Sequence, residues 1–333
     1  MTLPRPTKVL DAYWTFAHER HMMWLRRLDD PSGPWTTDPI LQSHRFTNSY
    51  RVLDRVSQHL VRDIQYGAGR TQAPAEVFFR TILFKIFNKI ETWNLLEQAL
   101  GGMSWQSFDR MKATCVLDEA MARGTALYSA AYIMPTPPYG HARKHANHLE
   151  MLERMMLAGM PGRVCATSHL SEVYDLMLEW PGLGPFLAFQ YAIDLNYSSM
   201  IDHDEAAFVV AGPGAHDGIS KCFENAAGSR AEDVIMEMYR IQDEEFERLS
   251  LPFQGLFGRR LMPIDLQNCF CETSKYTRRS HPEVVGIANR TRIKQKYVAG
   301  DRPIRAPFLP PSWNLTVPER HRTTAGPKQG LLL

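Results

Sequence analysis

Apolar residues along the chain recur mainly at the three- and four-residue spacing that is typical of amphipathic helices. Residues 45–63 place five apolar side chains on one such stripe: Tyr50, Leu53, Val56, Leu60 and Val61. Residues 75–100 form a longer apolar-rich pattern, which Gly101-Gly102 would end. Similar spacing predicts helices over about 117–132, 142–159, 168–179, 186–195, 230–249 and 262–273. Runs that alternate apolar and polar residues are nearly absent, so the pattern predicts an all-α protein.

A glycine-rich turn and a group of acidic residues lie near the two ends of the stretch 179–208. The turn Pro181-Gly182-Leu183-Gly184-Pro185 separates two predicted helices, and its glycines allow a sharp bend and a close approach to a ligand. The N–H groups that begin the second helix suit a phosphate, although an ordinary turn between two helices is the alternative interpretation. At the other end, Asp202, Asp204 and Glu205 place three carboxylates within four residues, and an aspartate there can instead simply cap the segment that follows.

Composition argues for a globular protein of a reducing compartment. No run approaches the ~18 apolar residues of a membrane span, and the N-terminal MTLPRPTKVLDAYW has no apolar signal segment. The cysteines are odd in number and scattered, which argues against a disulfide framework. His141, His145 and His148 share a helical face but have no carboxylate or cysteine partner in view. We therefore expect a cytoplasmic protein with no membrane partner, no metal and no cofactor.

Positive charge is concentrated towards the C-terminal end. Between Lys275 and Arg305 there are nine Lys/Arg against Glu283 and Asp301, a net charge of +7; the whole chain carries +2, so the remainder carries −5. A basic stripe on an otherwise acidic protein suits a polyanion such as DNA, and a solvated surface run is the alternative. The candidate DNA-binding residues of this stripe are Arg278, Arg279, Arg290, Arg292 and Lys294.

The glycine turn and the acidic residues together resemble the hairpin of helix-hairpin-helix DNA glycosylases, although Trp180 stands where those enzymes usually have leucine. Their catalytic aspartate commonly lies about 22 residues after the first hairpin glycine, which from Gly182 leads to Asp204, with Asp202 as the second candidate. The resemblance implies that Gly182 and Gly184 hold a backbone phosphate beside a flipped nucleotide. The carboxylate would stabilise the sugar cation that forms when the base leaves.

A second implication of the same resemblance concerns Phe186. Glycosylases that also cleave the strand carry a lysine just inside the hairpin helix, and this sequence has Phe186 there. The resemblance therefore implies a monofunctional enzyme that leaves an intact abasic site.

Several other stretches resemble a narrower family: PWTTDPIL (34–41), FTNSYRVLDRVSQ (46–58), FFRTILFKIFNKIETW (78–93), GPFLAFQYAIDLNYS (184–198), FVVAGPGAHDGISKCF (208–223) and LQNCFCETSKYTR (266–278). From about residue 15 to 305 they are similar to the helical domain of 5-hydroxymethyl-deoxyuridine DNA kinases, also called α-glutamyl/putrescinyl-thymine pyrophosphorylases. The family implies modified pyrimidines in DNA as the substrate class. It includes amino acid:DNA transferases, and some related stand-alone proteins are antiphage glycosylases.

The sequence offers no kinase phosphate loop. Gly214 to Lys221 does not match G-x-x-x-x-G-K-[ST], and AGPGAHDG is interpreted as a turn that approaches DNA or substrate, or as a purely structural turn.

Two groups of polar residues are candidates for substrate binding. Asn48, Arg51 and Asp54 are spaced by three and would share one helical face, where Asn48 can contact a base edge and Arg51 a phosphate or sugar substituent. A similar spacing relates three residues further along the chain: Glu272, Lys275 and Tyr276. A surface ion pair between the first two is the alternative interpretation.

We therefore expect an all-α, helix-hairpin-helix glycosylase-like fold with two helical lobes flanking a DNA cleft. The expected domain covers residues 1–305, with a hairpin lobe at about 140–225, and a Pro-rich tail follows at 306–333. The predicted function is a monofunctional DNA glycosylase that excises a bulky modified pyrimidine, such as glucosylated hydroxymethylcytosine, from double-stranded phage DNA in antiviral defence. We expect it to act as a monomer.

Two other functions stay open. One is an amino acid:DNA transferase or pyrophosphorylase that acts on a pyrophosphorylated hydroxymethyl-pyrimidine through Arg51 and Lys275. The other is a DNA-binding helical module without catalytic activity.

Overall fold

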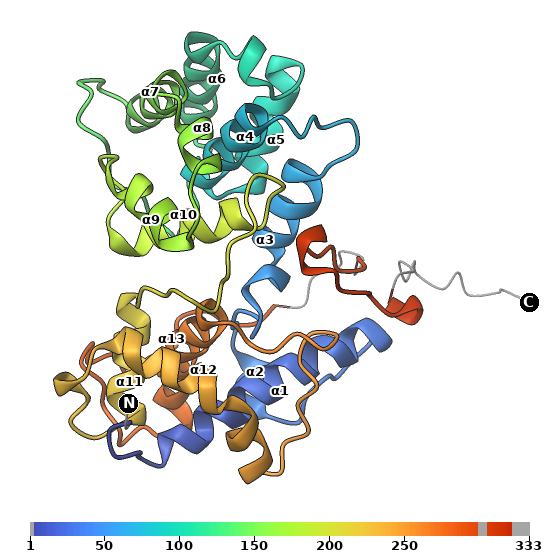
Figure 1. Cartoon of the computed structure of the whole chain (residues 1–333), viewed down its shortest axis with the longest axis vertical. Helices are drawn as coiled ribbons and strands as arrows, with labels where there is room; N and C mark the ends of the chain where they lie inside the picture. Colours follow the sequence, from blue (N-terminus) through green and yellow to red (C-terminus); the bar gives the residue numbers. More distant parts are fainter. Residues whose placement is uncertain (1–2, 299–304, 322–333) are drawn as a thin grey trace, which may run out of the picture. The chain divides into compact units, whose positions relative to one another are not determined.

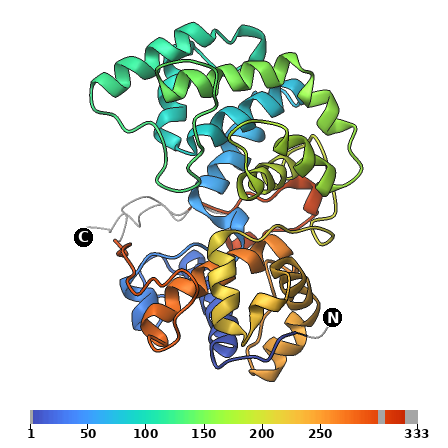
Figure 2. The same cartoon turned by 90° about the vertical axis from the view of Figure 1, so that its left-hand side faces the viewer.

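A computed structural model describes residues 3–298 and 305–321 of the 333-residue chain. Asp301 and Arg302 of the basic stretch lie outside the described residues, as do 322–333 of the Pro-rich tail. The described part contains thirteen α-helices and short helical turns but no strand, and Figures 1 and 2 accordingly draw only helices and loops. This confirms the all-α prediction. No helix in the described ranges combines the length and apolarity needed to cross a membrane.

The chain divides into two compact units. The first, here called the terminal unit, comprises residues 1–54, 209–307 and 315–333. The second, the middle unit, comprises residues 55–208 and 308–314. Each unit is therefore assembled from separate stretches of the chain.

The terminal unit contains five α-helices: α1 (Val9–Asp29), α2 (Pro39–Ser43), α11 (Pro213–Cys222), α12 (Ala231–Arg248) and α13 (Pro263–Ser280) (Figure 1). Aromatic rings join α1 to helices from the other end of the chain. The ring centroids of Tyr13 and Phe270 lie 4.4 Å apart, and those of Trp14 and Phe246 lie 5.0 Å apart. Such buried rings contribute both apolar area and edge-to-face attraction to the core.

Helix α11 contains the segment that was expected to form a turn. Gly212 precedes the helix and Pro213 occupies its first position, where a missing N–H costs nothing. A Cβ atom on Gly218 would lie 2.2 Å from the Phe270 carbonyl oxygen, and one on Gly214 would lie 2.2 Å from Cys271 Sγ. The glycines therefore serve the close packing of α11 on α13. The expectation of a loop that approaches DNA or substrate was wrong here.

The middle unit contains eight α-helices: α3 (Arg55–His59), α4 (Pro74–Phe87), α5 (Ile90–Leu100), α6 (Arg110–Ala122), α7 (Lys144–Leu157), α8 (Met160–Cys165), α9 (Leu170–Leu178) and α10 (Pro185–Asn196) (Figure 1). Two of them are buried on nearly every side, over residues 77–87 and 187–196. A helix that is buried all round lies at the centre of its domain. Helices α4 and α10 therefore form the core of this unit.

The helix predicted over residues 45–63 is not a single element. The chain instead forms a 3₁₀ turn at Arg51–Leu53, then α3, then a π-helical turn at Leu60–Gln65. The boundary between the units falls directly after Asp54. The Asp54 carboxylate accepts a hydrogen bond from the Asn48 backbone N–H at 2.8 Å, and such local bonds compete with helix formation.

Two further predicted helices have different bounds. The stretch 75–100 is divided into α4 and α5 because Asn88 adopts the left-handed conformation, with φ of 47°. The helix expected over about 117–132 is α6, which ends at Ala122 shortly before Gly124 at φ 83°. Residues in the left-handed region commonly end helices, and asparagine and glycine tolerate it best.

Candidate functional site

Exposed cations of the terminal unit form a strip composed of two segments that are distant in sequence and of one residue, Arg279, near the end of α13. Residues 290–297 run beside residues 43–45: the Arg45 N–H donates to the Gln295 carbonyl at 3.1 Å, and the Tyr297 N–H donates to the Ser43 carbonyl at 3.0 Å. We call the following side chains the basic strip: Arg45, Arg279, Arg290, Arg292, Lys294 and Lys296. All six are exposed.

An apolar cluster holds the strip in place. Ile293 is buried with Phe16, Leu41 and Phe46, so its side chain points inward while its neighbours Arg292 and Lys294 point outward. This in–out alternation is the geometry of an extended segment that rests on a core.

The cations of the basic strip have no acidic partner. None of the six forms an ion pair with a described residue. The positive charge of the strip also affects the nearby His44. Burial lowers the pKa of His44, and the charge of Lys296 lowers it further. A set of unpaired cations this close together is suited to a polyanion backbone.

Arg278 lies at the edge of the strip rather than on it. It is half-buried, and its guanidinium donates to the Arg292 carbonyl at 3.0 Å. Burial lowers its pKa, and the nearby charge of Arg290 lowers it further. In this geometry Arg278 holds the strip, and the DNA contact expected from the sequence stays a prediction.

Two of the predicted substrate-binding residues on α13 are bonded to the segment before the 3₁₀ turn. Glu272 Oε2 accepts the Thr47 N–H at 3.0 Å and lies 2.6 Å from Lys275 Nζ. Lys275 Nζ also donates to the Arg45 carbonyl at 2.9 Å. The pair is largely buried and therefore fixes the backbone that carries Arg45.

Tyr276, the third residue of that group, has a similar bond. Its hydroxyl donates to Asp38 Oδ2 at 2.6 Å, and the other oxygen of Asp38 caps α2 by accepting the Ile40 and Leu41 N–H groups. The structure thus brings the three predicted α13 residues together, but with their polar atoms bonded to the protein.

Asn48, Arg51 and Asp54 do not share a helical face, so that part of the prediction was wrong. The Asn48 amide donates to the Leu53 carbonyl at 2.8 Å and to Asp54 at 3.3 Å, closing the turn that ends the terminal unit. Arg51 is buried, and its backbone N–H donates to Asp265 at 2.8 Å. These bonds replace the regular helix that the spacing suggested.

Two carboxylates near this turn have raised pKa values. Burial raises the pKa of Asp54 to about 6, against opposing effects from Asn48 and Arg20. Burial also raises the pKa of Asp265 to about 6. Asp265 was absent from the predicted site, and Asp54 was named there only as a neighbour of Asn48 and Arg51, because the burial that raises both pKa values is a tertiary property.

In the middle unit, the glycine turn joins α9 to α10. Gly182 adopts φ of 87°, and a Cβ atom there would lie 3.1 Å from the Pro135 carbonyl. Gly184 is exposed, and a Cβ atom there would meet nothing within 4 Å. The positive φ therefore explains why residue 182 is glycine. At residue 184, the surroundings leave room for a larger side chain.

Both candidate catalytic aspartates lie in the segment after α10. Asp202 and Asp204 are exposed, and Asp204 Oδ1 accepts the N–H of Ala206 at 2.8 Å. The neighbouring His203 N–H donates to the side chain of Asn196, the last residue of α10, at 2.8 Å.

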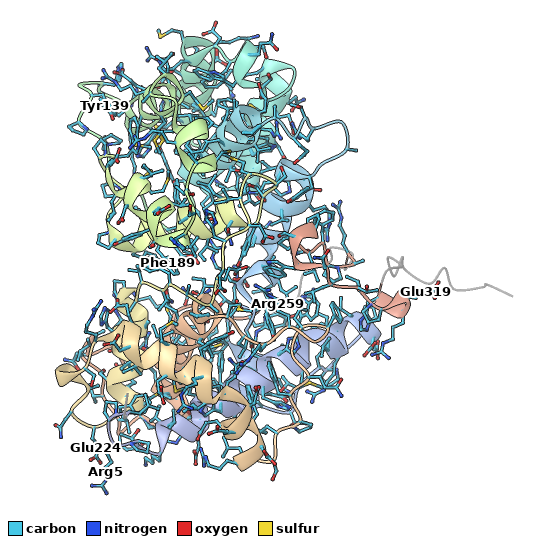
Figure 3. The ribbon with its side chains drawn as sticks, in the orientation of Figure 1. Arg5, Tyr139, Phe189, Glu224, Arg259 and Glu319 are labelled. Atoms are coloured by element: carbon cyan, nitrogen blue, oxygen red, sulfur yellow. The ribbon has the colours of Figure 1, made fainter. Side chains whose placement is uncertain are left out.

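The structure does not bring these aspartates to the glycine turn. The turn lies at the start of α10 and His203 at its end, and twelve residues of α-helix span about 18 Å. The chain then turns back, since Phe208 packs against Phe189 of α10 with ring centroids 5.8 Å apart. Phe189 is labelled in Figure 3. The turn and the aspartates therefore lie near opposite ends of one helix.

The third carboxylate of this segment, Glu205, is covered by the C-terminal tail, which the sequence did not predict. Glu205 is buried and accepts the Trp313 indole N–H at 3.0 Å. Phe308 of the same tail segment lies 5.6 Å from Tyr66, ring centroid to centroid. The paired aromatic residues in APFLPPSW are the signal that this part of the tail packs rather than frays.

The described residues include no group of three His, Cys, Asp or Glu side chains placed to hold a metal. His148 instead lies 2.7 Å from the Tyr128 hydroxyl and 2.8 Å from the Pro135 carbonyl. These bonds assign it to the internal hydrogen-bond network of the middle unit.

Comparison with known proteins places these features in a family. The family model described as "5-hmdU DNA kinase, helical domain" matches residues 7–286. A protein named 5-hmdU DNA kinase, from Bacillus phage SP10, is 23% identical over 284 residues, which cover 80% of this chain and 44% of that protein. The chain thus spans less than half the length of this relative, and no solved structure matches. Because the family model covers most of the chain, with Arg45, Arg279 and both aspartates among the matched residues, the chain belongs to the family of 5-hmdU DNA kinase helical domains.

Proposed function

We propose that this chain is a DNA-modification enzyme that binds DNA through the basic strip and acts on a hydroxymethyl-pyrimidine within it. The observation that carries the proposal is the strip itself: six exposed cations that form no ion pair with any described residue, in the unit that also holds two carboxylates of raised pKa. Among related proteins, the phage SP10 relative is named for action on 5-hmdU in DNA.

The reaction that we propose is a transfer to an activated hydroxymethyl group. An amine attacks the exocyclic methylene carbon of a pyrophosphorylated hydroxymethyl-pyrimidine, a C–N bond forms, and the C–O bond to pyrophosphate breaks. The amine releases one proton. Asp54, with a pKa of about 6, is the base that we assign to that proton. Arg51 and Lys275 are the proposed ligands of the departing pyrophosphate, and because Arg51 is buried and Lys275 is bonded to Glu272 and the Arg45 carbonyl, the proposal requires that phosphate oxygens replace these internal contacts.

Kinase activity is not part of the proposal. The relative that bears the name is more than twice as long as the matched region. The glycine-containing stretch of this chain forms α11, and its glycines pack against the α13 backbone, so it cannot cradle a phosphate.

The glycosylase is retained as the second candidate. The exposure of Asp202 and Asp204 favours it, because a carboxylate must be accessible to stabilise a sugar cation. The length of α10 between the glycine turn and these residues argues against a shared nucleotide, since successive nucleotides of one strand are ~3.4 Å apart along the helix axis.

One assay separates the two reactions. The protein is incubated with duplexes containing 5-hydroxymethyl-dU, its pyrophosphorylated form, or glucosylated 5-hydroxymethyl-dC, each with a mixture of amino acids and polyamines. Mass spectrometry then identifies the products. An amine-substituted nucleoside with release of pyrophosphate supports the transfer, and a free base supports the glycosylase. Binding without either product would overturn both reactions and leave a DNA-binding module.

The matched variants are Asp54→Asn and Asp204→Asn. Loss of the amine-substituted product in the first variant alone agrees with the transfer. Loss of free base in the second alone agrees with the glycosylase.

A further inference from the structure

Two apolar side chains of the terminal unit are exposed beside the basic strip. Val285 is 56% exposed and Ile287 is 71% exposed, and both belong to the loop 281–289 that connects α13 to the strip. Isolated apolar residues on a surface are common. Val285 and Ile287 differ from such isolated residues because hydrogen bonds fix their loop to α11.

The residue between them faces inward. A Cβ atom on Gly286 would lie 2.3 Å from Asp217 Oδ1 and 2.8 Å from Lys221 Cε, so only glycine fits there. Gly286 lies against α11, whereas Val285 and Ile287 on either side of it are exposed to solvent.

Hydrogen bonds fix the loop to α11. The Ala288 N–H donates to Asp217 Oδ1 at 2.7 Å, and the Ile287 N–H donates to Ser220 Oγ at 3.3 Å. The Asp217 carboxylate is buried and also accepts the Ser274 hydroxyl. The loop thus rests on a buried polar group rather than on mobile surface contacts.

Lys221 completes that buried group. Its ammonium donates to the Ser274 carbonyl at 2.8 Å and to Thr277 Oγ1 at 3.3 Å, and it lies 3.9 Å from Asp217. Burial lowers its pKa. Both charges of this pair are used to join α11, α13 and the loop, so neither is available to a substrate.

The loop leads directly into the cations. Arg290 and Arg292 follow the loop in sequence. Arg278 links the loop to these cations: the charges of Asp217 and Arg290 both act on its pKa, and its guanidinium donates to the Arg292 carbonyl. A rigid apolar pair flanked by unpaired arginines is the composition of a DNA-bending wedge. In such proteins apolar side chains enter between base steps while basic groups hold the backbone.

We propose that Val285 and Ile287 form a wedge that enters the stack of the DNA bound by the basic strip and unstacks the base beside the modified pyrimidine. The occupant is a nucleic acid duplex, because the loop leads into Arg290 and Arg292, which are exposed and form no ion pair with a described residue, whereas the carboxylate of the loop, Glu283, is already paired with Lys8. This inference rests on the proposed DNA binding and adds how the target base becomes accessible.

The test uses a duplex with 2-aminopurine next to 5-hydroxymethyl-dU, since this base fluoresces more strongly when it is unstacked. The full chain should raise the fluorescence on binding. The double variant Val285→Ala/Ile287→Ala should lose most of that rise, about fivefold or more, while the salt dependence of binding stays unchanged. The matched control is Leu157→Ala, which removes a 75% exposed apolar side chain of the middle unit and should behave as the unsubstituted protein.

A second variant keeps the apolar side chains but moves them. Gly286→Ala places a methyl group against Asp217, so the loop must shift and the fluorescence rise should fall although Val285 and Ile287 remain. Thermal melting monitors the fold of each variant. Full fluorescence in the double variant would overturn the wedge, as would binding by the unsubstituted protein without any rise. Absence of DNA binding by the unsubstituted protein would instead overturn the proposed function together with the wedge.

Discussion

The basic strip of the terminal unit and the surface cations of the middle unit differ in how their charges are paired, although Arg240 and Arg248 of the terminal unit also form ion pairs. In the middle unit, surface cations are paired: the Arg163 guanidinium forms two bonds with Glu179, at 2.8 and 2.7 Å, and Arg154 bonds Glu150 at 2.6 Å. In the terminal unit, the six cations of the basic strip face solvent without such partners. Unpaired like charges repel one another, so their concentration indicates a polyanionic partner rather than a contribution to stability.

This difference changes where DNA contact is expected. The sequence resemblance pointed first to the glycine turn of the middle unit, and the charge pattern pointed to residues 275–305. Around the turn, Glu179 is acidic and already bonded to Arg163. The electrostatics of the described residues therefore favour the strip as the main contact with the DNA backbone.

The largest expected effect concerns the buried ion pair of the middle unit. Lys85 Nζ lies 3.0 Å from Asp194 Oδ2, and both side chains are almost fully buried. Asp194→Asn should lower the free energy of unfolding by about 3–5 kcal/mol, because it leaves a buried cation without its counter-charge. Urea denaturation measures this loss. The exposed pair provides the control: Glu179→Gln should cost at most about 1 kcal/mol.

A second prediction tests the strip against the paired cations. Replacing Arg290, Arg292 and Lys294 together by alanine should weaken DNA binding by about 100-fold at moderate salt and lower the slope of log affinity against log salt by about three. Fluorescence anisotropy over a salt series measures both. Arg163→Ala in the middle unit should leave affinity and slope unchanged. An equal loss in both variants would contradict the contrast between the units.

A third prediction concerns Asp54 and pH. Its folded-state pKa of about 6 exceeds the ordinary value of 3.8. Between these two pH values the folded protein keeps a proton on Asp54 that the unfolded chain has lost. The stability that this carboxyl contributes is present at low pH and is lost as the pH rises through 6. Asp54→Asn, which stays neutral, should therefore gain about 1–2 kcal/mol relative to the unsubstituted protein above pH 7 and nothing at pH 4. Thermal melting at the two pH values checks this. A pH-independent difference would count against the raised pKa.

The smallest effects are expected at the glycine turn. Gly182→Ala should cost about 1 kcal/mol of stability, because alanine is disfavoured at φ 87°. Gly184→Ala meets nothing within 4 Å and should be neutral for stability. If the strip dominates binding, Gly184→Ala should change DNA affinity less than twofold. A tenfold loss of affinity would restore the turn as a principal phosphate contact.

Helical periodicity and local charge determined much of what the sequence predicted correctly. The all-α class follows from apolar spacing, and α7, α9, α10 and α12 lie close to their expected ranges. These properties depend on neighbours within a few residues, so they are present in the linear pattern. The concentration of positive charge in residues 275–305 was visible for the same reason.

Only the tertiary structure decided which of those elements meet. It divided the predicted 45–63 helix at the boundary between the units, brought Arg45 beside Gln295, and buried Glu205 under Trp313. It also converted the glycines of α11 into a packing surface and used Asp217 to fix the loop with Val285 and Ile287. Burial, pairing of charges and the pKa values that follow from them arise from residues distant in the chain, and no local pattern encodes those distances.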